Sequence, residues 1–373
     1  MNVALVHDWL NQIGGAEDVL ETLTHVYPDV PIYTSLYWQQ KMPSQWQSWD
    51  IHTSMIDKLP FAHTRHQMYL PLYPMAFEHF DFSDYDLVIS NKSGFCHGIV
   101  TGPDTLHVCY CLTPTRYVWR YHQYAKQENI SAPARAVLPP FISYLRQWDR
   151  VAADRVDHFI AISEEVRRRI AKIYQRDAAI IYPPVDTSRF DISNRVDDYY
   201  LLVGRLVPYR NIDILIEAFN QMQRPLLITG SGRDRERLEA LAGPTVQFLG
   251  YVPDDELPDL FARCRAFMWP GEEDFGIAPV QAMASGRPVI AYAAGGALET
   301  VIAGQTGAFF AEQTVEAIID AVEAFDTNSV DPGFLRLHAE QFDTAVFKRK
   351  ISRFVDQKMR DQQPKQQQQR QIY

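Results

Sequence analysis

The stretch "AFMWPGEEDFGIAPVQAMASGRPVIAY", residues 266–292, decides the class of fold. Its ends, "AFMWP" and "PVIAY", are short apolar runs typical of buried strands, and residues 277–285 between them predict a short helix. Strands that alternate with helices in this way form parallel sheets covered by helices. The stretch therefore predicts an α/β fold, with "GEEDFG" in the loop at the carboxyl end of its first strand.

The same alternation continues over most of the 373 residues, a length that suits two domains. A first series of expected strands begins at Val3, Asp86, His107, Asp157 and Ala178, and a second begins at Tyr199, Pro225, Val246, Ala266 and Pro288. Helices are expected over residues 211–221, 235–242, 255–264 and 277–285. Two such series predict two doubly wound domains, and the cleft between them is the expected ligand site.

The domain boundaries follow from the same pattern. Residues 1–190 form the first predicted domain and residues 191–342 the second. A last helix over residues 343–360 is expected to return to the first domain. Residues 361–373 are rich in glutamine, have little apolar surface to bury, and are predicted to be disordered.

Composition limits the classes of function. The net charge of −10 argues against general nucleic-acid binding. The N-terminus reads as a first strand rather than a signal peptide, and no run approaches the roughly 18 apolar residues that span a bilayer, so we expect a cytoplasmic protein. The four cysteines and eleven histidines show no metal-ligand spacing, which predicts no metal site and buried, reduced thiols.

Two arginines mark a candidate anion site in the second domain. Arg205 follows the strand that ends at Gly204, and Arg210 lies five residues later, before the next helix. Ligands of open α/β sheets bind at the carboxyl ends of strands, where two guanidinium groups would suit a diphosphate. Two solvated surface arginines are an equally good reading of the spacing alone.

The opening stretch places acidic side chains beside that site. A helix beginning near Ile277 would present free N–H groups and a partial positive charge to a phosphate. Glu272, Glu273 and Asp274 would repel phosphate, so sugar or ribose hydroxyl groups are their natural partners. The alternative is that these acids only cap the helix.

At this point the chain resembles a known family. "GRLVPYR", "EDFGIAPVQAMASGRPVIA", "VHDWLNQIGGAEDVLETL", "CYCLTPTRYVW", "AISEEVRRRI" and "GGALETVIAGQTGAFF" occur in the order found in family-4 retaining glycosyltransferases of the GT-B fold. The resemblance covers about residues 1–358 and is strongest to bacterial O-antigen and polysaccharide mannosyltransferases. It implies two Rossmann-like domains facing across a cleft. It also implies metal-independent transfer of a hexose, first of all mannose from GDP-mannose, from a nucleotide diphosphate sugar to a glycan or lipid-linked acceptor, without a cofactor.

The resemblance assigns roles to particular residues. Arg205 and Arg210 match the phosphate-binding pair, with Arg210 in place of the usual lysine, and Glu273 matches the glutamate that contacts the donor sugar. Gln281 stands where a second glutamate usually binds the ribose, and an amide there should bind it more weakly. The remaining donor-binding positions implied by the family are Gly14, Gly15, Gly250, Tyr251, Val252, Asp274, Phe275, Gly276 and Ile277.

A second departure from the family pattern concerns Leu112, which stands where the family has a histidine that contacts the 6-hydroxyl of the donor sugar. Leucine cannot form that hydrogen bond, so Leu112 either lines a pocket for a methyl group or packs in the core. A 6-deoxyhexose donor and a catalytically weakened scaffold subunit therefore stay open as alternatives. An epimerase fits the motifs less well, and a nicotinamide dehydrogenase is unsupported because no G-x-G-x-x-G follows a strand.

Positive charge gathers on one part of the first domain. If the acceptor is lipid-linked, this charge would favour contact with the inner face of an anionic membrane. Solvated helix faces are an equally good reading. The cluster comprises Arg146, Arg150, Arg155, Arg167, Arg168 and Arg169.

Overall fold

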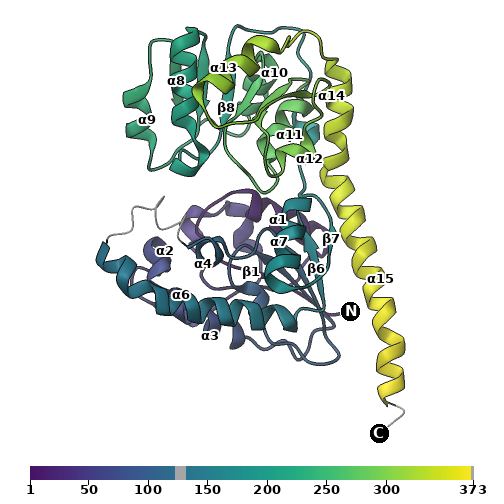
Figure 1. The fold of residues 1–373 in the computed structure, drawn as a ribbon. Coiled ribbons are helices and arrows are strands. Elements are labelled where there is room, and N and C mark those ends of the chain that lie inside the picture. The colour runs from purple at the N-terminus through teal and green to yellow at the C-terminus, as the bar shows by residue number, and fades with distance from the viewer. Residues whose placement is uncertain (122–131, 371–373) are drawn as a thin grey trace. The chain divides into compact units, whose positions relative to one another are not determined.

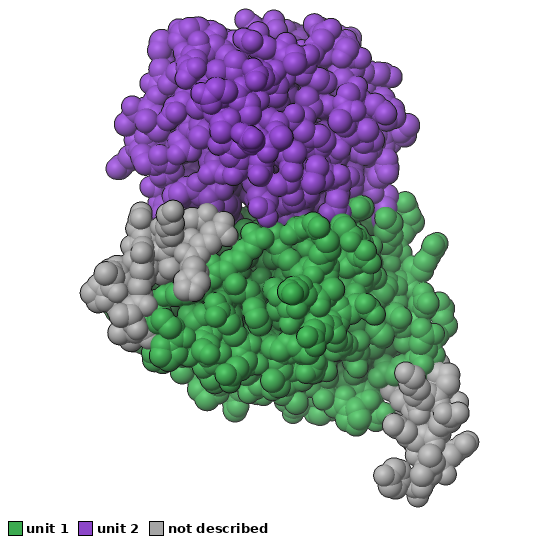
Figure 2. All heavy atoms as spheres, viewed as in Figure 1, with its two compact units in different colours: residues 1–184, 347–373 green, residues 185–346 purple. Residues whose placement is uncertain are grey.

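The structure is a computed structural model that describes the backbone of residues 1–121 and 132–370, and the side chains of these residues except 132–137 and 363–370. It divides into two compact units, coloured separately in Figure 2. Unit 1 comprises residues 1–184 and 347–373, and unit 2 comprises residues 185–346. The division lies six residues before the boundary expected from the sequence, and the last helix belongs for most of its length to unit 1.

Unit 1 is built on a seven-stranded parallel sheet with the order β3-β2-β1-β4-β5-β6-β7. Chain order reverses between β1 and β4, which are neighbours, so their carboxyl ends form the switch point of this sheet. Figure 1 shows its helices. The strands are β1 (Val3–His7), β2 (Ile32–Thr34), β3 (Ile51–Thr53), β4 (Leu87–Lys92), β5 (Leu106–Cys111), β6 (His158–Ala161) and β7 (Ala178–Ile180), and the helices are α1 (Gly15–Val26), α2 (Ala62–Arg65), α3 (Tyr73–Glu78), α4 (Arg116–Trp119), α6 (Ala132–Ala152), α7 (Glu164–Tyr174) and α15 (Thr344–Arg370).

Unit 2 repeats this architecture with a six-stranded parallel sheet of order β10-β9-β8-β11-β12-β13. The switch point lies between β8 and β11, which are paired at Leu201 and Phe267. The strands are β8 (Tyr200–Val203), β9 (Leu226–Thr229), β10 (Val246–Gly250), β11 (Phe267–Trp269), β12 (Val289–Tyr292) and β13 (Gly307–Phe310), and the helices are α8 (Ile212–Met222), α9 (Arg235–Leu241), α10 (Leu257–Arg263), α11 (Ile277–Ala284), α12 (Ala297–Thr300), α13 (Val315–Ala324) and α14 (Pro332–Ala339).

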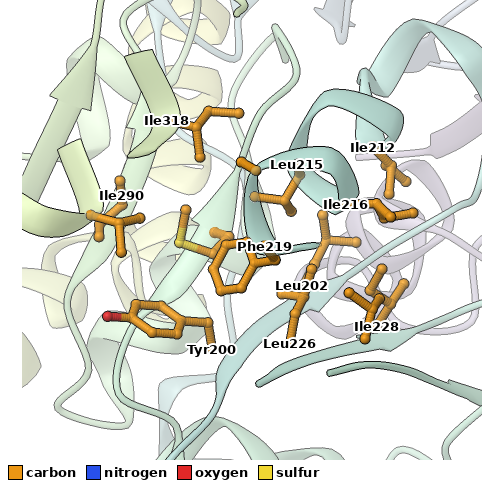
Figure 3. Packing of buried hydrophobic residues seen from close by; sticks show 14 of the residues in the cluster. Tyr200, Leu202, Ile212, Leu215, Ile216, Phe219, Leu226, Ile228, Ile290 and Ile318 are labelled. Carbon is orange, nitrogen blue, oxygen red and sulfur yellow. The ribbon is translucent and has the colours of Figure 1, made fainter. Parts of the chain in front are cut away.

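Helix α8 shows how the core of unit 2 holds the sheet in place. Ile212, Leu215, Ile216 and Phe219 recur at helical spacing on one face and are fully or almost fully buried (Figure 3). The ring of Phe219 meets that of Tyr200 edge-on at 5.1 Å. Burying each such side chain contributes about 1.5–3 kcal/mol, so the helix that follows Arg210 is firmly anchored.

All ten strands expected from the sequence are present, and the two-domain α/β prediction is confirmed. The sequence reading missed β2 and β3, which have three residues each and are too short to show alternation, and it missed β13. Helix α15 continues to Arg370, although the sequence predicted disorder from residue 361. Glutamine, lysine and arginine are good helix formers, which is the physical reason for the longer helix. Residues 371–373 lie outside the described chain.

Candidate functional site

The switch point of unit 2 brings Arg210 and Glu273 together. Nη2 of Arg210 lies 2.8 Å from Oε1 of Glu273, and the two side chains are only 13% and 17% exposed. The guanidinium group also stacks over the ring of Trp269, 4.9 Å from its centre. Arg210 lies in the connection after β8, whereas Trp269 ends β11 and Glu273 lies in the loop that follows β11. Neighbouring strands therefore unite residues that are 63 positions apart.

The Arg210–Glu273 pair leaves hydrogen-bonding capacity unused. Buried Nε of Arg210 has no hydrogen-bond partner among the described residues, and buried Oε1 of Glu273 has none beyond its ion pair with Nη2 of Arg210. Buried polar atoms without partners are costly and are uncommon in native proteins. A ligand with both phosphate oxygens and hydroxyl groups would satisfy the two side chains at once.

Two glycines make room for this arrangement. A Cβ built on Gly204 would lie 2.0 Å from Nη1 of Arg210, so the space beside Gly204 is taken by the arginine. Gly295 has a φ of +59°, and a Cβ there would lie 2.2 Å from the carbonyl oxygen of Glu273. That oxygen also accepts a hydrogen bond of 2.8 Å from the N–H of Gly296. The backbone at Glu273 is thus fixed by a close approach that a side chain would prevent.

Helix α11 begins at Ile277, immediately after this loop. Its N-cap is Gly276, which has no side chain to cap the helix, and its first turn has no acidic residue. The first N–H groups of α11 have no acceptor within the helix itself. Gln281 lies half-buried on the same helix. Within the same loop Asp274 is 7% exposed, and Phe275 packs edge-on against Phe342 at 5.5 Å.

The other predicted positions of unit 2 lie at the same edge of the sheet but further from Arg210. Arg205 is exposed, and its Nη2 lies 3.5 Å from the hydroxyl of Tyr209. Gly250 ends β10, which is separated from β11 by two strands, and its carbonyl accepts a hydrogen bond from the Thr229 hydroxyl at 2.9 Å. Tyr251 is 74% exposed and Val252 is half-buried. These residues are placed at the carboxyl ends of strands, as expected for ligand contacts.

In unit 1 the structure places the predicted residues beside the carboxyl ends of β1 and β5. Gly15 is the first residue of α1, and Gly14 caps it with φ of −178°, a conformation open to any residue. The glycine at position 14 is thus not required by backbone geometry. Leu112 follows β5 directly, is half-buried rather than sealed in the core, and donates its N–H to the carbonyl of Lys92 at 2.8 Å.

The sequence reading missed a buried ionic network beneath Leu112. Lys92 is completely buried, and its Nζ lies 3.3 Å from the carbonyl of Thr113, 3.1 Å from the hydroxyl of Thr115 and 3.9 Å from Oδ1 of Asp149. Asp149 accepts further hydrogen bonds from the side chains of Thr115 and Tyr174, both at 2.8 Å. The charged pair therefore holds residues 113–115 against the end of β4. The only signal in the sequence is a run of polar residues, "SNKS", after a buried strand.

The electrostatics of this network favour the ionised pair. Burial lowers the pKa of Lys92, but the combined attraction of Asp149, Cys111, Cys109 and Asp8 outweighs burial, and the net pKa is raised. Burial raises the pKa of Asp149, but the charge of Lys92, together with hydrogen bonds from Trp119 and Thr115, leaves it lowered. For His97, burial and then repulsion by Lys92 lower the pKa to about 4, so this histidine is neutral near pH 7.

A second carboxylate organises the loop after β4. Asp8 is buried at the end of β1, and its oxygens accept hydrogen bonds of 2.6–2.8 Å from four consecutive backbone N–H groups. Next to it, Nε2 of His7 lies 3.3 Å from Oε1 of Glu17 in helix α1. These contacts fix the backbone of the loop after β4 at the switch point of unit 1. The four N–H donors belong to Ser93, Gly94, Phe95 and Cys96.

The arginine cluster predicted to face a membrane is largely engaged within the protein. Nε of Arg146 donates a hydrogen bond to the carbonyl of Val118 at 2.8 Å. The other five arginines of the cluster each lie within 4.0 Å of a carboxylate. The pairs are Arg150–Asp154, Arg155–Glu78, Arg167–Glu164, Arg168–Glu165 and Arg169–Glu165. The positive charge counted from the sequence is therefore mostly neutralised locally.

Three further features concern metals, thiols and membranes. Within residues 1–121 and 132–370, no group of three His, Cys, Asp or Glu side chains is arranged as a metal site. The four cysteines are free and buried. No helix in the described chain is long and apolar enough to cross a bilayer.

Comparison with known proteins agrees with the fold and the motifs. The chain is 33% identical over 193 residues to a GDP-mannose-dependent alpha-(1-6)-phosphatidylinositol monomannoside mannosyltransferase of Mycolicibacterium smegmatis, which covers 43% of this chain and 50% of that relative. It is 30% identical over 159 residues to the O-antigen chain mannosyltransferase RfbU of Salmonella typhimurium, with 39% and 45% covered. The chain thus spans about half the length of these relatives.

Solved structures extend the likeness over the whole fold. HepE of Anabaena in complex with UDP and glucose aligns with a TM-score of 0.69 at 18% identity, covering 95% of this chain and 99% of that one. Sucrose-phosphate synthase of Thermosynechococcus elongatus aligns with a TM-score of 0.72 at 18% identity, covering 96% and 99%. At these identities the likeness shows the fold, which is the GT-B fold expected from the sequence.

Family models match the chain in two consecutive parts. Residues 13–189 match the model of Glycosyltransferase Family 4, and residues 186–349 match that of Glycosyl transferases group 1. The two matches overlap by four residues near the boundary between the two units, and together they contain every candidate site residue described above. The chain therefore belongs to the family-4, group 1 glycosyltransferases.

Proposed function

We propose that the protein transfers a hexose, with mannose from GDP-mannose as the first candidate, from a nucleotide diphosphate sugar to a glycan or lipid-linked acceptor in polysaccharide biosynthesis. The observation that carries the proposal is the Arg210–Glu273 pair at the switch point of unit 2, next to the start of α11, whose N-cap is Gly276. The mannosyltransferase relatives support mannose as the sugar. HepE, crystallised with UDP-glucose, supports a nucleotide sugar as the donor class.

The proposed roles follow from the chemistry of each group. Arg205, Arg210 and the N–H groups of α11 stabilise the charge that grows on the leaving diphosphate, and Glu273 accepts hydrogen bonds from the donor sugar. Gln281 binds the ribose, and residues 250–252 lie near the base. No metal is needed in this scheme, because cationic side chains and a helix N-terminus already surround the phosphates.

The proposed stereochemistry is retention, through substitution on one face of an oxocarbenium-like ion pair. Glu273 is held by Arg210 rather than free to attack, which supports a mechanism without a covalent intermediate. The products would be the nucleoside diphosphate and an acceptor whose hydroxyl oxygen has formed the new glycosidic bond and lost its proton.

The test is a donor panel with and without chelator. GDP-, UDP- and dTDP-sugars are compared first by thermal shift, since a ligand bound only to the folded state raises the melting temperature, and then by release of the nucleoside diphosphate. We expect GDP-mannose to give the largest shift and turnover that persists in EDTA. NMR of the product's anomeric carbon reports retention or inversion. Binding without turnover of any donor, in the presence of an acceptor extract, would favour the scaffold alternative.

A 6-deoxyhexose donor is the second candidate, and it rests on Leu112. This side chain is half-buried at the end of β5, where the family has a histidine that meets the 6-hydroxyl. Leucine would leave that hydroxyl without a partner but would accept a methyl group. GDP-mannose and its 6-deoxy counterpart, compared side by side, distinguish the two donors.

We also propose that the protein acts at the inner, cytoplasmic face of a membrane, because the expected acceptor is lipid-linked. The paired arginines of α6 and α7 argue against those residues as the contact. Co-sedimentation with anionic vesicles, compared with neutral vesicles, tests membrane contact itself.

A further inference from the structure

A groove in unit 1 lies apart from the sheet edges described above. It has a volume of about 550 Å³ and is formed by the end of α1 and one face of α15. His25 and Val26 line it from α1, and the residues from α15 are Lys348, Arg349, Ser352, Arg353, Asp356 and Arg360. Both walls belong to unit 1, so the groove does not depend on the position of unit 2.

The groove concentrates positive charge in an acidic protein. Four cationic side chains face one carboxylate, Asp356, which gives a formal charge of +3 in a chain whose net charge is −10. Arg349, Arg353 and Arg360 follow a helical spacing of four and seven, so they form one stripe along α15. At about 1.5 Å per residue, the stripe is roughly 16 Å long.

These cations also differ from the other arginines in how they are paired. Within the part of the chain that the structure describes, no carboxylate lies within 4.0 Å of Lys348, Arg349, Arg353 or Arg360, whereas the arginines of α6 and α7 reach acidic partners. The carbonyl end of α1 carries only about half a negative charge, which cannot neutralise the groove. Asp356 is exposed and lies three residues after Arg353 on the same helix.

We propose that this groove is a second anion site, which binds a compact ligand bearing two or more phosphate groups. Guanidinium groups bind phosphate through paired hydrogen bonds, and a stripe of three arginines with a neighbouring lysine can engage several phosphates at once. The volume suits a small ligand, and the overall negative charge of the protein disfavours a long polyanion such as nucleic acid. The phosphates could belong to a soluble molecule or to a lipid headgroup.

The groove residues favour the soluble source. None of the large hydrophobic side chains exposed on unit 1 lines this groove, so it offers electrostatic contacts without an apolar surface to enter a bilayer. Binding should therefore weaken steeply as salt is added.

The test uses tripolyphosphate as the soluble probe and phosphatidylcholine vesicles with or without phosphatidylglycerol as the lipid probe. Calorimetry is performed on the Arg205→Glu variant of the full chain, in which the reversed charge weakens the phosphate site proposed in unit 2. In this background we compare Arg349→Gln/Arg353→Gln with the matched pair Lys350→Gln/Lys358→Gln. The control lysines lie on the same helix, outside the groove, near the rings of Tyr182 and Phe354.

Both pairs remove two positive charges, and glutamine preserves helix propensity, which circular dichroism can verify. We expect the groove pair to weaken binding at least about tenfold, since each hydrogen bond to a charged group typically contributes that much. The control pair should change it by no more than about twofold, because distant exposed charges are screened. A loss seen only with anionic vesicles assigns the phosphates to lipid. Equal losses for the two pairs, or no binding of either probe, would overturn the proposal.

Discussion

Replacing Gly204 by alanine should disable the site without unfolding the protein. A Cβ at this position would lie 2.0 Å from Nη1 of Arg210, whereas ordinary contact begins near 3.4 Å. The guanidinium group must therefore move by about 1.4 Å, the difference between these distances. Gly204 does not have a positive φ, and the crowded atom is the end of a flexible side chain, so the backbone can accept alanine.

We expect this displacement to disturb the contacts of Arg210 with Trp269 and Glu273. A shift of about 1 Å in a positioning group can lower the rate by roughly 10²-fold, which we expect for kcat/KM of Gly204→Ala. The change in unfolding free energy should stay within about 1 kcal/mol, because the lost cation–π contact is offset by the lower flexibility of alanine in the unfolded chain.

The assay is release of nucleoside diphosphate, measured together with thermal unfolding. Gly102→Ala is the matched control, since a Cβ there meets nothing closer than 3.9 Å. The decisive comparison is a double-mutant cycle with Arg210→Ala. Once the arginine is absent, alanine at position 204 has nothing to displace and should cost no further activity. If Gly204→Ala lowers kcat/KM equally in both backgrounds, Gly204 does not act through Arg210 and the reasoning fails.

Three further predictions concern charge, sugar specificity and pH. Arg205→Glu should lower turnover by more than about 10²-fold while leaving the melting temperature nearly unchanged, because the side chain is exposed; near-normal turnover would remove it from the site. Leu112→His should shift preference toward the 6-hydroxy donor by about tenfold or more, since a buried unpaired hydroxyl costs about 1–3 kcal/mol; unchanged preference would show that Leu112 does not contact carbon 6. Burial lowers the pKa of His66 and His97 to about 4 and that of His107 to about 3, so the unfolded chain binds more protons below pH 6.5. Stability should be full above pH 6.5 and fall as the pH drops toward 4, by up to about 1.4 kcal/mol per unit for each histidine; urea midpoints that are equal at pH 7 and pH 5 would contradict this.

The buried pair Lys92–Asp149 illustrates what a sequence cannot show. Lysine in "SNKS" has the composition of a surface turn, and Asp149 lies 57 positions later within a helix. Only the folded chain shows that both are fully buried and that they hold the carbonyl and hydroxyl groups next to Leu112. Their burial depends on the packing of a helix over the sheet, for which local spacing carries no signal.

The arginines of α6 and α7 make the same point for surface charge. Counting them along the chain suggested a basic face, yet most are paired with acids three or four residues away or on another element. The sequence reading did not single out the basic stripe on α15, although its cations have no acidic partners within 4.0 Å in the described structure. Charge pairing depends on side-chain direction, which composition does not contain.

The sequence by itself determined the alternation of strands and helices, a division near residue 190, and the positions of Arg205, Arg210 and Glu273 after strands. These features follow from local hydrophobic periodicity and from glycine and proline at the ends of elements. Tertiary structure alone decided that β8 and β11 are neighbours, so that Arg210 meets Glu273, and that Gly204 and Gly295 leave them room. Strand order in a parallel sheet arises from contacts between distant segments, and no short stretch of sequence encodes which strands will pair.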